Sequence, residues 1–284
     1  MSEPSDRAFL LAQRLLPKQA LTEAVGWLAA RRGGALTRFA IRRFIDRYRV
    51  DMSEAADPDP AAYPTFNAFF TRPLRVDARV LASTAWICPV DGAVSQCGPI
   101  ADGSIVQAKG HHYSAAELLG GDTALAERFR TGSFATLYLS PRDYHRIHMP
   151  ADGRLLSMVH VPGTLYSVNP VTARGIAGLF ARNERVVCVF ERGDGTPFVM
   201  VLVGATIVGS MATVWHGVVN PPRPGTLRRW DYSDQSIVLK QGEEMGRFLL
   251  GSTVILLVPP GESSAWPAWA SGRPVRLGEA LATH

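Results

Sequence analysis

Residues 185–208, RVVCVFERGDGTPFVMVLVGATIV, contain two β-prone runs, Arg185–Phe190 and Phe198–Val208, with Gly and Pro between them. Val, Ile and Phe favour strands, whereas Gly and Pro favour the turns that separate strands. The same pattern continues on both sides of this stretch. We therefore predict a largely β-structured second half, with further strands at Ser133–Ser140, Arg154–Val161, Ala212–Trp215 and Thr253–Val258.

The start of the chain has a different pattern. Residues 7–49 have apolar clusters at helical spacing, interrupted by Pro17 and by Gly33-Gly34, and residues 51–65 form an Asp-, Pro- and Ala-rich linker. One further helical segment is expected at Glu117–Arg130. The fold class is therefore α+β, with N-terminal amphipathic helices followed by a compact β-rich body resembling a barrel or sandwich. We expect a helical region at 1–50, a linker at 51–65 and a catalytic domain at 66–284.

The composition is that of an ordinary globular chain of 284 residues, with 46% hydrophobic and 19% charged residues. No apolar run reaches 18 residues, so no spanning helix is predicted. The first residues lack the basic and apolar regions of a secretory signal, which favours the cytoplasmic side. Three cysteines without a CxxC pair argue against a disulfide framework or a cysteine-based zinc site.

Positive charge is concentrated at the start of the chain. Residues 1–50 hold ten Lys and Arg against four Asp and Glu, whereas the rest holds twenty against twenty-one. Trp, Phe and Leu beside arginines are typical of helices that lie on a membrane surface, and each basic residue near anionic lipid adds about 1 kcal/mol. The alternative is a set of surface helices with solvated arginines. Nucleic acid is disfavoured because no aromatic–basic stacking motif follows.

Residues 140–150, SPRDYHRIHMP, contain two histidines three positions apart, His145 and His148. The start Ser-Pro-x-Asp is typical of a helix N-terminus, so we expect a turn of helix that Pro150 ends. The histidines would then share one face. A zinc site would need a third ligand, which has no clear position in the sequence, so no metal is predicted. A structural or a catalytic role is open for the pair.

Three other segments carry reactive residue types. Asp91 lies in Pro89-Val90-Asp91-Gly92, where a turn-forming role would explain it. Ser167 lies in residues 162–170, a Gly- and hydroxyl-rich loop that could hold a phosphate but matches no P-loop. Ser252 follows Gly251 at the entrance of a strand. Asp, His and Ser together can activate a hydroxyl group, but many such trios occur by chance in a chain of this length.

In combination, these segments resemble the bacterial phosphatidylserine decarboxylase proenzymes over nearly the whole chain. The motifs that carry the resemblance are residues 16–18, 48–52, 66–72, 89–92, 144–150, 180–185, 203–210 and 250–253. The most specific is the last, Leu250-Gly251-Ser252-Thr253, which corresponds to the LGST-type maturation site of the family.

The resemblance implies a self-cleaving enzyme. Asp91 and His148 would act with Ser252, whose hydroxyl would attack the carbonyl carbon of Gly251. Cleavage would give a β chain, 1–251, and an α chain, 252–284, with Ser252 converted into a covalent pyruvoyl group. This group would form a Schiff base with the amine of phosphatidylserine, and the products would be phosphatidylethanolamine and CO2.

Other residue roles and partners also follow from the resemblance alone. His145 or His148 would protonate the product, and His145 and Ser167 would lie near the phosphate of the head group. The protein would be a homodimer, bound peripherally to anionic membrane at the cytoplasmic face of the cell membrane.

Three alternatives remain open on the sequence. A serine hydrolase could use Asp91, His148 and Ser252, but the G-x-S-x-G motif is absent. A membrane-binding or lipid-transfer module would show neither cleavage nor turnover. A pyruvoyl enzyme for a soluble amino acid is disfavoured by the basic amphipathic opening.

Overall fold

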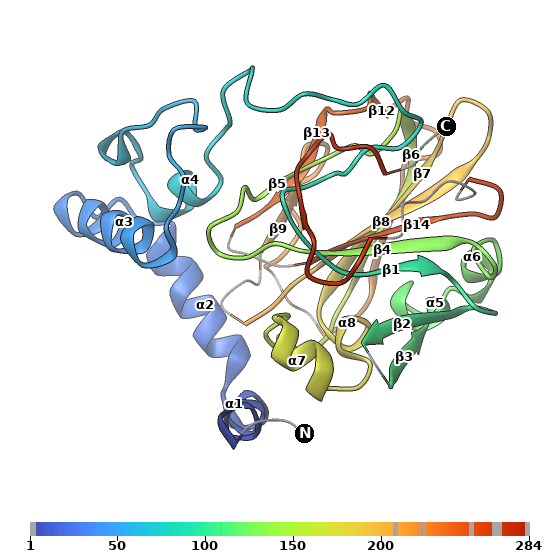
Figure 1. Ribbon diagram of the computed structural model, residues 1–284, viewed down its shortest axis with the longest axis horizontal. Coiled ribbons are helices and arrows are strands. Elements are labelled where there is room, and N and C mark those ends of the chain that lie inside the picture. Colours follow the sequence, from blue (N-terminus) through green and yellow to red (C-terminus); the bar gives the residue numbers. More distant parts are fainter. Residues whose placement is uncertain are drawn as a thin grey trace.

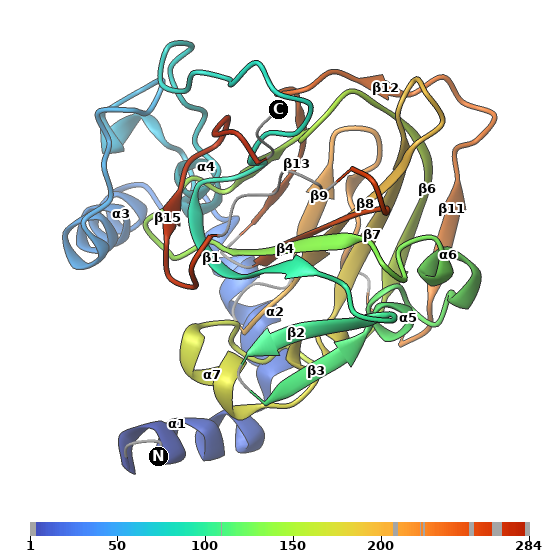
Figure 2. The same cartoon turned by 45° about the vertical axis from the view of Figure 1, so that its right-hand side comes forward.

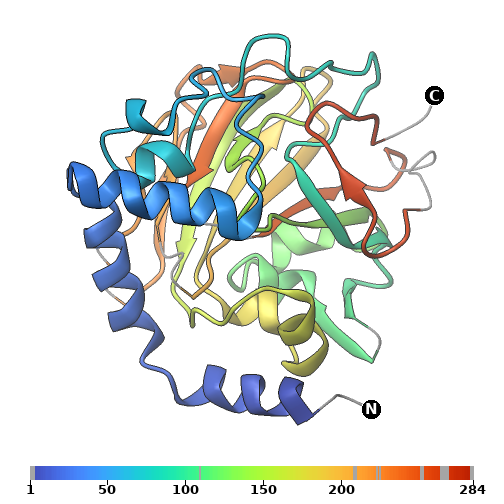
Figure 3. The same ribbon diagram turned by 60° about the vertical axis from the view of Figure 1, so that its left-hand side comes forward.

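The computed structural model describes residues 4–108, 110–206, 210–221, 223, 225–249, 253–262 and 269–281. Three helices open the chain along one side of a β-rich body (Figure 1; Figure 3). They are α1 (Pro4–Leu15), α2 (Lys18–Ala29) and α3 (Ala35–Tyr48). The other helices are short: η1 (Pro60–Ala62), α4 (Phe66–Phe70), α5 (Ala115–Leu118), α6 (Thr123–Glu127), α7 (Pro170–Gly175) and α8 (Leu179–Arg182). The predicted α+β class is confirmed.

The body is built on a nine-stranded antiparallel sheet. Its strand order is β11-β6-β7-β8-β14-β4-β1-β15, and β12 also pairs with β6. The strands are β1 (Gly92–Pro99), β4 (Ser133–Tyr138), β6 (Gly153–Val161), β7 (Arg185–Glu191), β8 (Pro197–Val203), β11 (Arg228–Asp231), β12 (Val238–Leu239), β14 (Thr253–Val258) and β15 (Pro274–Val275). Strand β14 lies between β8 and β4 and is buried throughout. The two strands predicted within residues 185–208 are confirmed and pair with each other, although β8 ends at Val203.

A second, four-stranded sheet has the order β10-β9-β13-β5. Its strands are β5 (Arg146–His148), β9 (Met211–Thr213), β10 (Gly217–Val218) and β13 (Glu244–Phe248). The strands β2 (Ser104–Ala108) and β3 (His111–Ser114) form a separate hairpin near α5 and α7 (Figure 2). Strand β13 belongs to the small sheet, and the next strand along the chain, β14, belongs to the large one.

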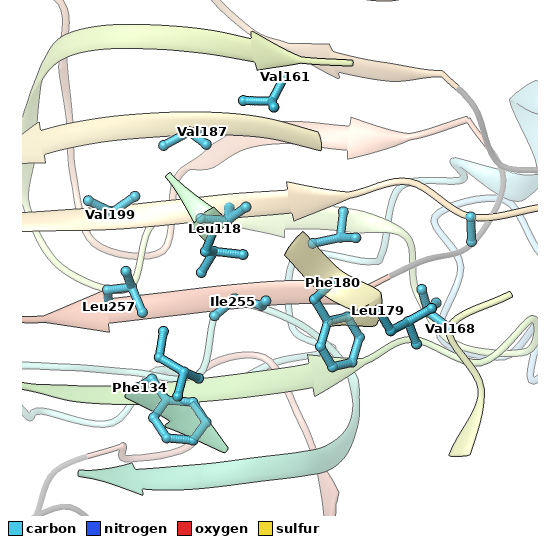
Figure 4. Packing of buried hydrophobic residues seen from close by; sticks show 14 of the residues in the cluster. Leu118, Phe134, Val161, Val168, Leu179, Phe180, Val187, Val199, Ile255 and Leu257 are labelled. Carbon is cyan, nitrogen blue, oxygen red and sulfur yellow. The ribbon is translucent and has the colours of Figure 1, made fainter. Parts of the chain in front are cut away.

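Both faces of the large sheet are buried. Val199 and Val201 of β8 point into a cluster that includes Leu118 and Phe180 from the short helices (Figure 4). Met200 of β8 and its neighbour Leu202 point the other way, into a cluster that includes Ile147 and Phe248 of the small sheet. Strands covered on both faces have continuous apolar runs instead of alternating ones, which explains the sequence pattern of β7, β8 and β14.

The three opening helices leave large apolar side chains exposed, and few of their side chains reach the body. Ile41 of α3 is fully buried, and the ring of Phe44 lies 5.1 Å from that of Phe66. Leu10 of α1 packs so tightly on Gly175 that a Cβ atom there would lie 2.3 Å from Leu10 Cδ1. The exposed apolar residues are Leu11, Leu15, Leu16, Trp27, Leu28, Leu36 and Phe39. None of the helices within the described ranges has the length and hydropathy needed to cross a membrane.

Two local predictions need correction. The helical turn expected after Ser140 is wrong, because the segment forms a turn followed by strand β5. The Asp143 carboxylate accepts hydrogen bonds from the backbone N–H and the hydroxyl of Ser140, which is local chemistry that favours turns as much as helix starts. The helix expected at Glu117–Arg130 is two short helices, separated by Gly120 and Gly121, which both have positive φ.

Candidate active site

Asp91 lies directly before β1 and is 8% exposed. Its carboxylate accepts hydrogen bonds from the backbone N–H of Leu277 at 2.8 Å and from Arg79 Nε at 3.0 Å. A second guanidinium nitrogen of Arg79 bonds the other carboxylate oxygen, and this same nitrogen also donates to Glu54 at 2.7 Å. Asp91 is therefore held by a bidentate arginine, which favours one fixed orientation.

His148 is the last residue of β5, and its backbone N–H donates to Pro89 O at 2.9 Å, next to Asp91. Its Nδ1 lies 2.7 Å from Gly242 O, and its Nε2 lies 3.0 Å from the Tyr144 hydroxyl oxygen. A carbonyl oxygen only accepts, so Nδ1 carries the proton and Nε2 has the free lone pair. Tyr144 consequently donates to Nε2. The imidazole is oriented as a base.

The loss of hydration on burial keeps the His148 imidazole neutral. Burial lowers its pKa, while the hydrogen bond to Gly242 and the carboxylates of Glu244 and Asp91 oppose the shift. Burial also raises the pKa of Tyr144, which keeps that hydroxyl protonated. Within the described ranges Asp91 and His148 share no hydrogen bond, because Arg79 and Leu277 take the oxygens of Asp91. A backbone hydrogen bond from His148 to Pro89 holds their two segments together. The negative charge of Asp91 acts on the imidazole through space and favours its protonated form.

His145 is completely buried. Its Nδ1–H donates to Asp143 O at 2.8 Å, and its ring centre lies 4.0 Å from that of Phe70. Burial, offset in part by the bond to Asp143, lowers its pKa to about 3. Its Nε2 has no hydrogen-bond partner among the described residues. His145 is therefore a neutral group with an unused acceptor in a buried position.

The bond between Gly251 and Ser252 lies outside the described residues, but the structure fixes both flanks. Before it, the backbone N–H of Phe248 donates to His145 O at 3.0 Å. After it, Thr253 is the first residue of β14 and lies opposite Val203 and Tyr138. The chain leading to the predicted cleavage site thus starts beside His145, and Thr253 is fully buried.

Ser167 follows β6 in a loop that other segments hold in place. Its backbone N–H donates at 2.9 Å to the side chain of Gln13 in α1. Buried Asn183 bonds both the N–H and the C=O of Tyr166, at 3.1 and 2.8 Å. The Tyr166 ring lies under Lys18 Nζ at 4.6 Å. The loop is therefore anchored from both the β-body and the opening helices.

Sequence reasoning missed three residues that shape this site. Tyr144 lies in the quoted motif, but the expected helix hid its contact with His148. Arg79 has no local signal, because its partners Glu54 and Asp91 are far along the chain. Gln13 lies in a helix that was considered only for membrane contact. Over the described part of the chain, no group of three or more His, Cys, Asp or Glu could hold a metal ion.

Known proteins resemble this chain over nearly its whole length. A family model described as phosphatidylserine decarboxylase matches residues 66–283, and a second one, described as PSD, matches residues 8–49. A phosphatidylserine decarboxylase proenzyme of Acidovorax ebreus is 67% identical over 278 residues, covering 98% of each chain. The proenzyme of Chromobacterium violaceum is 65% identical over 279 residues, covering 98% of this chain and all of that one. This chain belongs to the phosphatidylserine decarboxylase family.

Proposed function

We propose that the protein converts phosphatidylserine into phosphatidylethanolamine and CO2, after cleaving its own backbone between Gly251 and Ser252. The observation that carries the proposal is His148, a half-buried neutral imidazole whose Nε2 lone pair is oriented as a base. The family membership of the whole chain supports the substrate.

In self-cleavage, His148 Nε2 accepts the hydroxyl proton of Ser252, and the hydroxyl oxygen attacks the carbonyl carbon of Gly251. An ester replaces the amide, and elimination then releases residues 1–251 from residues 252–284. Glycine has no Cβ to hinder this attack. For the transfer, Nε2 must exchange the Tyr144 hydroxyl for that of Ser252. The negative charge of Asp91 stabilises the imidazolium that forms.

The dehydroalanine that elimination leaves at position 252 would take up water and lose ammonia, which gives the pyruvoyl group. The carbonyl of this group would condense with the substrate amine and withdraw electrons from the bond to the leaving CO2. The surroundings fit such a group. Nε2 of His145 and Oγ1 of Thr253 are buried and lack hydrogen-bond partners among the described residues. Both can bind polar atoms of the substrate there, in a site whose buried lining excludes water.

The histidines differ in what they can do next. With a pKa of about 3, His145 is neutral at cytoplasmic pH and suits binding better than proton donation. His148, which has already accepted a proton in maturation, is the better general acid for the product. We assign head-group binding to His145 and to Ser167, whose loop is anchored by Asn183 and Gln13.

The opening helices would hold the enzyme on the bilayer, as a region of residues 1–50 joined by a linker at 51–65 to the catalytic domain. Exposed Trp27, Leu36 and Phe39 are 55%, 74% and 63% accessible, beside six arginines of α3 and of its connection to α2. These six are Arg31, Arg32, Arg38, Arg42, Arg43 and Arg47. This surface supports peripheral binding to anionic lipid at the cytoplasmic face. We also propose a homodimer, from family resemblance alone.

Intact mass and a decarboxylation assay test the proposal. The wild type should give two chains, whereas Ser252→Ala should stay a single species near 30.9 kDa without turnover. His148→Ala should slow cleavage by about 100-fold or more, the usual contribution of a general base. His112→Ala is the matched control, because His112 is exposed on β3 and should cut normally. An uncut wild type that still releases CO2 would refute the proposed maturation.

A further inference from the structure

A pocket of about 300 Å³ lies beside Asp91, on the side of the body that faces the end of α3. That volume is at the lower end of the range for ligand pockets. Its charged lining residues are Arg49, Asp51, Glu54, Arg72, Arg79, Asp91, Arg142, Asp143 and Arg276. Five arginines thus face four carboxylates, and neither His145 nor Ser167 belongs to the lining.

The carboxylates are already bound elsewhere in the pocket wall. Arg79 bonds Asp91 and Glu54, and Arg276 lies 3.3 Å from the second oxygen of Glu54. Asp51 accepts two bonds from Ser53, and Asp143 accepts two from Ser140. The contact of Arg142 with Asp143 is long, at 3.8 Å.

Arg72 is the residue that points to a ligand. It is only 4% exposed, and within the described ranges no carboxylate forms an ion pair with it. Among the described residues its Nε has no hydrogen-bond partner. Its guanidinium donates to Arg142 O over a long contact of 3.4 Å and lies 5.4 Å from the centre of the Phe69 ring. The carboxylates of Asp91, Asp143 and Asp51 act on this guanidinium only through space. A buried guanidinium without a direct ion pair is unfavourable, and a bound anion would reduce that cost.

Arg49, another lining residue of the pocket, supports the same inference. It ends α3 with φ 54° and ψ 53°, the left-handed conformation in which glycine is the common residue. An arginine here carries a strained backbone and brings a guanidinium to the pocket rim. Among the described residues it too has no carboxylate partner. Arginine forks match the oxygens of phosphate groups.

We infer that this pocket binds a phosphate-type anion between Arg49, Arg72 and Arg142. The source favoured by position is the head group of an anionic phospholipid, because α3 continues from the rim into the exposed apolar and basic surface around Phe39. A soluble phosphate ester has the same chemistry and is the second possible source. The inference does not depend on the proposed decarboxylation, because its test is binding.

The experiment compares two double variants of the mature protein. Arg49→Gly with Arg142→Gln removes two pocket charges, the first at a backbone position that suits glycine and the second in a side chain that is 65% exposed. Arg42→Gln with Arg43→Gln removes two exposed charges of α3 that do not line the pocket. The probes are inorganic phosphate, followed by the shift in Tm, and phosphatidylcholine vesicles with or without phosphatidylglycerol.

A phosphate-dependent rise in Tm that only the pocket variant loses supports a site open to soluble anions. Loss of phosphatidylglycerol binding by tenfold or more, beyond the loss in the α3 control, supports a lipid head group even when phosphate alone has no effect. Equal behaviour of the two double variants with both probes would overturn the inference.

Discussion

The opening helices and the β-body differ in the exposure of their large apolar side chains. In the body, both faces of the large sheet are covered, and β14 is buried at every position. In the helices, Leu15 and Leu36 are 76% and 74% exposed. A folded domain gains stability by burying such side chains, so their exposure supports the proposed contact of this surface with a membrane. The comparison shows that apolar composition alone does not distinguish a core residue from an exposed surface residue. The position of the residue in the fold makes that distinction.

The two regions are nevertheless in contact at the loop that contains Ser167, which belongs to the proposed substrate site. Gln13 is buried, and its side-chain oxygen accepts bonds from the Ser167 N–H and, at 3.2 Å, from the Thr206 hydroxyl. The helix that would lie against lipid thus also holds two loops of the body. This contact predicts that removing residues 1–49 damages the site as well as membrane binding.

The largest expected effect lies in the body, at buried His145. Its pKa is about 3 when folded and 6.5 when unfolded, so the unfolded chain binds the extra proton as pH falls below 6.5. His145 therefore stabilises the fold above pH 6.5 and loses this contribution towards pH 3. Between pH 7 and pH 4, the unfolding free energy of the protein with His145 should fall by roughly 3 kcal/mol more than that of the His145→Gln variant.

Urea unfolding of the Ser252→Ala precursor, with and without His145→Gln, measures this difference on a single unbroken chain. His112→Gln is the control, because His112 is exposed on β3. A His145→Gln curve that falls with acid as steeply as its parent would show that this imidazole is not held neutral.

A smaller effect is expected on the helices. Trp27→Ser with Leu28→Ser removes two apolar side chains that are 55% and 61% exposed. Vesicle binding should fall by about tenfold or more, because each buried apolar side chain contributes roughly 1.5–3 kcal/mol to partition. Co-sedimentation with anionic vesicles measures the loss, while Tm should stay unchanged. Val76→Ser with Val80→Ser is the matched pair on the body, and equal loss there would erase the contrast between the regions.

The smallest effect tests the junction. Gln13→Leu leaves the Ser167 N–H without its acceptor, a change that costs roughly 1–3 kcal/mol when the group is buried. Turnover of phosphatidylserine should fall about fivefold or more, whereas vesicle binding should be nearly unchanged. Gln19→Leu, on exposed α2, is the control. If Gln13→Leu lowered only vesicle binding, the helix would be a membrane anchor without a role in the site.

Much of the site was predictable because the reactive residues lie in local motifs. The segments that contain Asp91, His145 and His148 are all contiguous, and the backbone bond from His148 to Pro89 brings two of them together. Arg79 and Gln13 could not be found in this way, because each acts on a residue more than ten positions away. The tautomer of His148 also depends on Gly242, which no motif contains.

The sequence by itself determined the α+β class, the strands around residues 185–208 and the family, because apolar periodicity and motif order are local properties of a chain. Only the tertiary structure decided that Asp91 bonds Arg79 instead of His148, that residues 146–148 form a strand, and that Gln13 reaches the Ser167 loop. These features depend on burial and on contacts between distant segments. Burial sets the pKa of both histidines, and folding alone brings the partners together.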